Sequence, residues 1–142
     1  MYQSECYCTN LRRSANAVSD YYDAEMKGTG LTSAQYYLLI TLSRLESANI
    51  THWAENVGLD RSTMVRNIRL LESRGLVEGT PGHGKSFTLS REGRSRLEAA
   101  VPVWREAQRK IEAFLGEEDA QAVLRIGERL RMLKDDPRSG ER

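Results

Sequence analysis

The sequence lacks several features that would assign a protein class at once. It has only two cysteines, a formal net charge of +1 and no apolar run near the ~20 residues that a membrane helix needs. Residues 1–10 also lack the apolar stretch of a secretion signal. We therefore expect a cytoplasmic chain without a membrane partner, in which thiols stay reduced. Because the total charge is so small, any basic surface must be local.

The remaining composition is that of a folded domain. Hydrophobic residues make up 39% and charged residues 29% of the 142 positions, which argues against low-complexity disorder. The length suits one domain over residues 1–142 with an added dimerisation element. Apolar side chains recur at spacings of three and four, which predicts helices over residues 9–27, 33–45, 61–73, 91–115 and 117–134.

Two of the expected helices follow each other tightly. Thr51 is a candidate N-cap for a short helix that ends at Gly58, and Asp60 is a candidate N-cap for the helix over 61–73. Two short strands, near 76–77 and over 86–89, flank the turn-forming stretch GTPGHG and predict a β-hairpin. The pattern indicates a mainly α fold with a small β-hairpin wing (α+β), the winged helix-turn-helix.

The helix over 61–73 concentrates arginine on one side. At 100° per residue, Met64, Ile68 and Leu71 share a narrow sector and should face the core. Arg66 and Arg69 then point the opposite way, together with small polar and apolar side chains. A guanidinium matches guanine or phosphate, so this face suits the DNA major groove, although a solvated helix surface would show a similar pattern.

The charge distribution favours the DNA interpretation. Residues 61–91 contain six basic and two acidic side chains, a local excess of +4, so the remainder of the chain has a net charge of −3. A positive module on a neutral protein is what phosphate binding requires. The candidate DNA contacts are Thr51, Arg61, Ser62, Thr63, Val65, Arg66, Asn67, Arg69, Arg74, His83 and Lys85.

Three segments resemble the MarR family of bacterial transcriptional regulators. GLDRSTMVRNIRLLESRGLV (58–77) is similar to its recognition segment, LTSAQYYLLITL (31–42) to its second helix, and LSREGRSRLEAAVPVWREAQ (89–108) to its strand-to-helix junction. The resemblance implies a winged-helix homodimer on double-stranded DNA with a pseudo-palindromic operator. The hairpin departs from the family, because TPGHGKS offers only His83 and Lys85 where an arginine is common. His83 is as consistent with a turn residue as with a contact.

The resemblance also implies that different segments of the chain serve dimerisation and DNA binding. Residues 9–30 and 95–134 would form dimerisation helices, residues 31–94 the DNA-binding lobe, and residues 135–142 a flexible tail. Many such proteins bind a small-molecule effector between the two parts. Aromatic side chains suit such a cleft, although aromatics at these spacings are commonly core residues. The candidates are Tyr21, Tyr22, Tyr36, Tyr37, Trp53 and Trp104.

Cys6 and Cys8 allow two interpretations. A thiol in the first turn of a helix has a lowered pKa, and some MarR-like regulators respond to oxidation through cysteines near their N-terminus. The two are too close in sequence for a comfortable bond within a helix, so an intersubunit disulfide is the redox hypothesis. The alternative is a pair of unreactive thiols.

Other function classes find less support in the sequence. A winged helix that binds only protein would place apolar residues at positions 62, 66 and 69, where this chain has serine and two arginines. We find no catalytic set and no phosphate-cradling loop, and the pair His52 and His83 lacks zinc-ligand spacing toward Cys6 and Cys8. We therefore predict a regulator, with repression as the expected mode, rather than an enzyme, and we predict no cofactor and no metal.

Overall fold

A computed structural model describes residues 5–81 and 84–140. Within it the chain divides into two compact units, Met1–Arg105 and Glu106–Arg142. The first contains α1 (Tyr7–Met26), η1 (Lys27–Thr29), α2 (Ser33–Leu45), β1 (Ala48–Asn49), α3 (Ile50–Val57), α4 (Arg61–Ser73), β2 (Val77–Gly79) and β3 (Ser86–Leu89). Helix α5 (Arg91–Leu115) runs from the first unit into the second, which continues with α6 (Glu117–Arg131), η2 (Leu133–Asp135) and η3 (Pro137–Gly140). None of the helices in the described ranges is long and apolar enough to cross a membrane.

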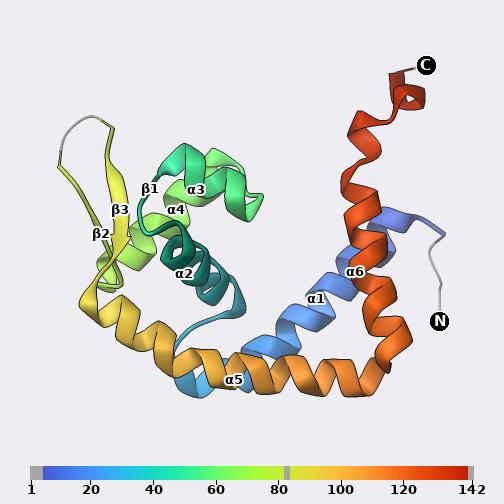
Figure 1. Cartoon of the computed structure of the whole chain (residues 1–142), viewed down its shortest axis with the longest axis horizontal. Helices are drawn as coiled ribbons and strands as arrows, with labels where there is room; N and C mark the ends of the chain where they lie inside the picture. Colours follow the sequence, from blue (N-terminus) through green and yellow to red (C-terminus); the bar gives the residue numbers. More distant parts are fainter. Residues whose placement is uncertain (1–4, 82–83, 141–142) are drawn as a thin grey trace. The chain divides into compact units, whose positions relative to one another are not determined.

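The first unit contains a winged helix, formed by α2, α3, α4 and the three strands. Helices α3 and α4 contact each other, α4 contacts β2, and α2 packs on α3 and β3 (Figure 1). The predicted mainly helical fold with a hairpin wing is confirmed: β2 and β3 are antiparallel, with Val77 opposite Leu89 and Gly79 opposite Phe87. The sheet has a third strand that the sequence analysis missed, because β1 pairs two residues with β3 and gives the order β1-β3-β2. Two residues are too few to show a strand period.

Local signals explain where the helices begin. Thr32 caps α2 through a capping box with Gln35, in which each side chain accepts from the other residue's backbone N–H. The prediction for α3 was wrong by two residues: Asn49, not Thr51, is the N-cap, and its side chain accepts from the backbone N–H of His52 at 2.8 Å. Pairing of β1 with β3 carries the extended backbone through Asn49, so the helix begins directly after it.

The core of the first unit lies between α2, α3, α4 and the sheet. Trp53 is fully buried, lies 6.1 Å from the Phe87 ring and donates from its indole nitrogen to the carbonyl of Leu38 at 3.1 Å. Each large apolar side chain buried in this way contributes roughly 1.5–3 kcal/mol to folding. The fully buried large side chains are Met26, Leu38, Leu39, Leu42, Trp53, Met64, Leu71, Leu76 and Phe87.

The second unit exposes much of its apolar surface. No residue of α6 is buried, and the stripe Val123, Ile126, Leu130 and Leu133 runs along it and into η2. Val123 is 58% exposed, Ile126 48% and Leu133 59%. Leu11 and Val18 of α1 are likewise exposed.

Candidate nucleic-acid interface

Helix α4 is held with one side in the core, as its spacing predicts. Met64 and Leu71 are 0% exposed and Ile68 is 2% exposed. Gly58 adopts a left-handed conformation with φ +74° at the end of α3, and two residues later the carboxylate of Asp60 accepts from the backbone N–H of Thr63 at 2.8 Å. The short turn and the cap together fix the start of α4, so its rotation about its own axis is determined.

This rotation exposes the outward face of α4, which we define as Ser62, Arg66 and Arg69. All three are exposed, and Val65 on the flank is half-buried. Arg61, Ser62, Val65 and Arg66 also line a shallow surface depression. Two guanidinium groups can therefore approach a ligand from one side of a rigid helix.

Asp60 engages the hydroxyl groups next to this face. Ser62 donates to Asp60 Oδ1 at 2.7 Å and Thr63 donates to Asp60 Oδ2 at 2.8 Å. The backbone N–H of Thr63, followed by these two hydroxyls, lowers the pKa of Asp60 to about 2. Because both hydroxyl protons are directed at the carboxylate, Ser62 and Thr63 remain free mainly as acceptors.

The other residues predicted around the turn lie close by. Arg61 donates to Thr51 Oγ1 at 3.2 Å, which joins the start of α4 to the first turn of α3. Asn67 is half-buried and donates to the carbonyl of Thr63 at 2.9 Å, the local hydrogen bond expected of it. The structure thus brings Thr51, Arg61 and the outward face of α4 onto one part of the lobe.

The wing contributes Lys85, which is held back toward α4. Its ammonium lies 3.3 Å from Glu72 Oε2 and 5.3 Å from the centre of the Phe87 ring. Gly79 makes room for it, since a Cβ there would collide with the lysine stem. His83, the other predicted wing contact, lies outside the described residues.

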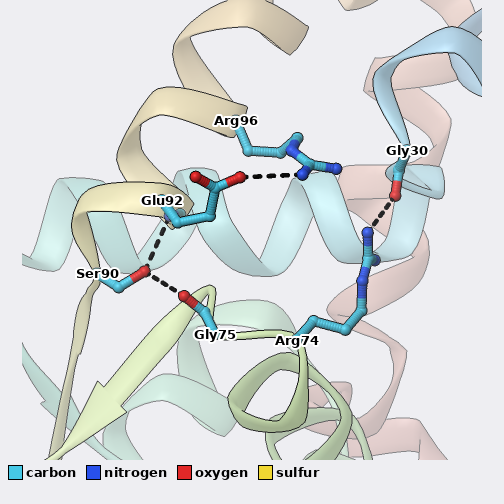
Figure 2. A network of polar contacts seen from close by, with 7 residues as sticks. Gly30, Arg74, Gly75, Ser90, Glu92 and Arg96 are labelled. Carbon is cyan, nitrogen blue, oxygen red and sulfur yellow. Dashed lines mark hydrogen bonds and ion pairs between the residues drawn. The ribbon is translucent and has the colours of Figure 1, made fainter.

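Arg74 lies at the end of α4, where a network of polar contacts surrounds the next turn (Figure 2). Its guanidinium donates to the carbonyl of Gly30 at 2.7 Å and to Gln35 Oε1 at 3.1 Å. On the other side of the turn, Ser90 donates to the carbonyl of Gly75, and its hydroxyl accepts from the backbone N–H of Gly93 at 2.9 Å. Neither set of contacts is predicted from the sequence, because each joins residues far apart along the chain.

Comparison with known proteins identifies the fold and its family. A model of the MarR family matches residues 31–84. The transcriptional regulator MosR of M. tuberculosis is 30% identical to this chain; the match covers 90% of this chain and 97% of MosR, with a TM-score of 0.78. This chain belongs to the MarR family. No protein among the curated sequences matches it.

Two further structures place this MarR-family chain among its relatives. MosR of M. tuberculosis in complex with DNA is 29% identical over 89% of this chain and 97% of that chain, with a TM-score of 0.77. BpsR of Bordetella bronchiseptica, whose DNA binding is regulated by 6-hydroxynicotinic acid, is 21% identical over 96% of this chain and 98% of that one, with a TM-score of 0.82. At this identity the likeness to BpsR shows a shared fold.

The aromatic residues predicted to line an effector cleft separate into three groups. Trp104 of α5 stacks with Tyr22 of α1, at 6.2 Å between ring centres, and with Tyr36 of α2, at 5.5 Å. Tyr36 is buried, and this burial raises the pKa of its hydroxyl. Trp53 packs in the core of the winged helix, so it is a core residue, as the alternative interpretation holds. Tyr21 and Tyr37 are exposed.

Cys6 and Cys8 of this MarR-family protein are both exposed, and neither forms a disulfide within residues 5–81 and 84–140. Cys6 is the N-cap residue of α1, and the backbone N–H of Thr9 lowers the pKa of its thiol. Cys8 lies one turn before Arg12, which approaches its sulfur at 3.5 Å. The structure thus places one thiol in the environment that favours thiolate.

Proposed function

We propose that this MarR-family protein is a DNA-binding transcriptional repressor that acts as a homodimer on a pseudo-palindromic operator. One observation carries the proposal: α4 buries Met64, Ile68 and Leu71 and thereby exposes Arg66 and Arg69 together on its opposite side. The DNA complex of MosR, a relative at 29% identity, supports the same use of the fold here.

The outward face of α4 fits the chemistry of the major groove. An arginine fork donates two parallel hydrogen bonds to guanine O6 and N7 or to a phosphate. Val65 on the flank suits the methyl group of thymine, and the serine oxygen can accept from an exocyclic amine. We assign base reading to Arg66 and Arg69, and backbone contacts to Arg61 and Lys85.

The exposed apolar stripes support the proposed homodimer. Leu11 and Val18 of α1 and the stripe along α6 need a partner surface, and a second copy supplies an identical one. A two-fold dimer would present two copies of α4 about 34 Å apart, one DNA turn, which matches two half-sites of a palindrome. A dimer seated on such an operator competes with other proteins for the same DNA, which is why we propose repression.

The decisive experiment is footprinting and gel-shift titration of the full chain on the DNA upstream of its own coding sequence. Arg66→Ala and Arg69→Ala should each weaken operator binding by about 1–3 kcal/mol and change the preference at one base position. Arg13→Ala, which removes the same charge from α1 outside the winged lobe, serves as the matched control. If wild-type protein binds no DNA specifically while it captures a protein partner, the alternative of a protein-interaction module replaces this proposal.

We propose further that oxidation of Cys6 or a small effector near the Tyr22, Trp104 and Tyr36 stack modulates affinity. Oxidation is favoured by the exposed Cys6 thiol with its lowered pKa, and the effector by an aromatic stack that joins three helices. Peroxide should weaken operator binding of wild-type protein and leave Cys6→Ser unaffected, with a dimer-sized band on a non-reducing gel. A phenolic effector should quench Trp104 fluorescence in a Trp53→Phe background as it releases DNA.

A further inference from the structure

Arg74 is the C-cap residue of α4, and its guanidinium is directed at other parts of the protein itself. One terminal nitrogen donates to the carbonyl of Gly30 and the other to Gln35 Oε1, residues 44 and 39 positions earlier in the chain. In Figure 2 the side chain extends from the end of α4 directly to the Gly30 carbonyl. Arg66, by contrast, contacts Thr63 Oγ1 of its own helix at 3.5 Å.

Both acceptors are themselves fixed. Gly30 ends η1 in a left-handed conformation with φ +74°, and its carbonyl therefore points in a defined direction. Gln35 Oε1 also accepts from the backbone N–H of Thr32 at 3.0 Å in the capping box of α2. A charged donor bound to two positioned acceptors makes stronger hydrogen bonds than a neutral pair would. Arg74 therefore ties the end of α4 to the connection between α1 and α2.

The opposite side of the same turn is tied to α5. The backbone N–H of Ser90 donates to the carbonyl of Leu76 at 3.1 Å, and the buried Ser90 hydroxyl donates to the carbonyl of Gly75. Rotation of α4 about its end thus requires breaking contacts on one side or the other. The contacts of Arg74 are the part of this attachment that lies on the surface of the lobe, whereas Ser90 is buried.

We propose that Arg74 is a positioning residue for operator recognition and not a phosphate contact. It fixes the angle of α4 against the start of α2, so that Arg66 and Arg69 meet their bases in register. The inference rests on the proposed DNA-binding function. It assigns to Arg74 a role in specificity, the difference in affinity between operator and unrelated DNA, because mispositioning affects base contacts more than phosphate attraction.

Two conservative substitutions distinguish a positioning residue from a phosphate contact. Operator affinity, affinity for unrelated DNA and the salt dependence of binding are measured for each. Arg74→Lys keeps the charge, but one ammonium cannot replace a fork bound to two acceptors. For a positioning residue, the ratio of operator to unrelated affinity should fall roughly tenfold, as expected for about two hydrogen bonds, with the salt slope unchanged. If Arg74 were a phosphate contact, lysine would replace it, and both the affinity ratio and the salt slope of Arg74→Lys would stay close to wild type.

For Gln35→Glu the two roles of Arg74 predict the opposite pattern, with specificity retained by a positioning residue and binding weakened for a phosphate contact. Glutamate keeps the oxygen that accepts from Thr32 and Arg74, so a positioning tie becomes an ion pair and specificity is retained. Were Arg74 a phosphate contact, a carboxylate beside it would compete with DNA, weakening all binding and lowering the salt slope by about one contact.

Hydrogen exchange of the DNA-free protein provides a second measurement. Arg74→Lys should increase exchange at the C-terminal end of α4 and at the Gly30 connection, with the sheet unchanged. Retained specificity in Arg74→Lys, or lost specificity in Gln35→Glu, overturns the inference and leaves the proposed function standing. Absence of specific DNA binding by wild-type protein overturns both.

Discussion

Lys85 in the wing forms an ion pair with Glu72 in α4, at 3.3 Å between Nζ and Oε2. Both side chains remain partly exposed, 43% and 32%, so the pair contributes little to folding. Its consequence concerns binding. The ammonium that the sequence assigns to DNA phosphates is already directed at a carboxylate, and a phosphate must compete with Glu72 for it.

Glu72→Gln should therefore raise DNA affinity. The substitution frees Lys85 for a phosphate, and the plot of log affinity against log salt should steepen by up to about one unit. Fluorescence anisotropy with a labelled duplex at several salt concentrations measures both quantities. Glu78→Gln, which removes an equal charge from the neighbouring strand β2, corrects for the general electrostatic effect. An identical slope in the two variants would mean that Lys85 does not reach phosphate.

Asp60 should make the stability of the protein depend on pH in the acid range. Its carboxyl has a pKa of about 2 in the folded state, below the ~3.9 of an unfolded aspartate. The stabilisation is therefore fully present above about pH 4 and is lost as the pH falls toward 2. Asp60→Asn retains a cap oxygen and has no such titration. Urea unfolding of both proteins should show a difference at pH 6 that shrinks between pH 4 and pH 2; a constant difference would contradict the assignment.

Gly93 should tolerate no side chain, although it lies within α5. A Cβ at this position would collide with the carbonyl oxygen of Leu76, a backbone atom that cannot rotate away. We expect Gly93→Ala to lower the free energy of unfolding by about 1–3 kcal/mol, the cost of overpacking. Gly28→Ala is the matched control, because a Cβ there meets nothing within 4 Å. Equal stability of the two variants in chemical denaturation would refute the close packing.

Ile126→Glu should shift the dimer that we propose toward monomer. The side chain lies in the apolar stripe of α6 and is 48% exposed in the single chain, so a charge there would be buried without a partner in a dimer. Sedimentation at micromolar concentration should show the smaller species, and operator affinity should fall with it. Gln121→Glu adds the same charge on the opposite side of α6 and should remain dimeric. Two variants of equal mass in solution would rule out this stripe as the interface.

The sequence by itself determined the elements whose signals are local. Asp60 as a cap and the spacing of Met64, Ile68 and Leu71 placed α4 over residues 61–73, where the structure has it. The strand over 86–89 was likewise confirmed, because turn-forming residues and a short apolar run specify a hairpin within about ten residues. Once the buried side of α4 was known, the exposure of Arg66 and Arg69 followed from helical geometry alone.

Tertiary structure decided every feature that depends on distant partners. Strand β1 exists through its pairing with β3, and that pairing made Asn49 rather than Thr51 the cap of α3. From the sequence, Arg74 was predicted to be one more basic DNA contact. In the fold, its guanidinium donates to the carbonyl of Gly30, 44 residues earlier in the chain. Helix periodicity and capping depend on residues a few positions apart, so they can be predicted from the sequence. A hydrogen bond between segments depends on where the whole fold carries each of them.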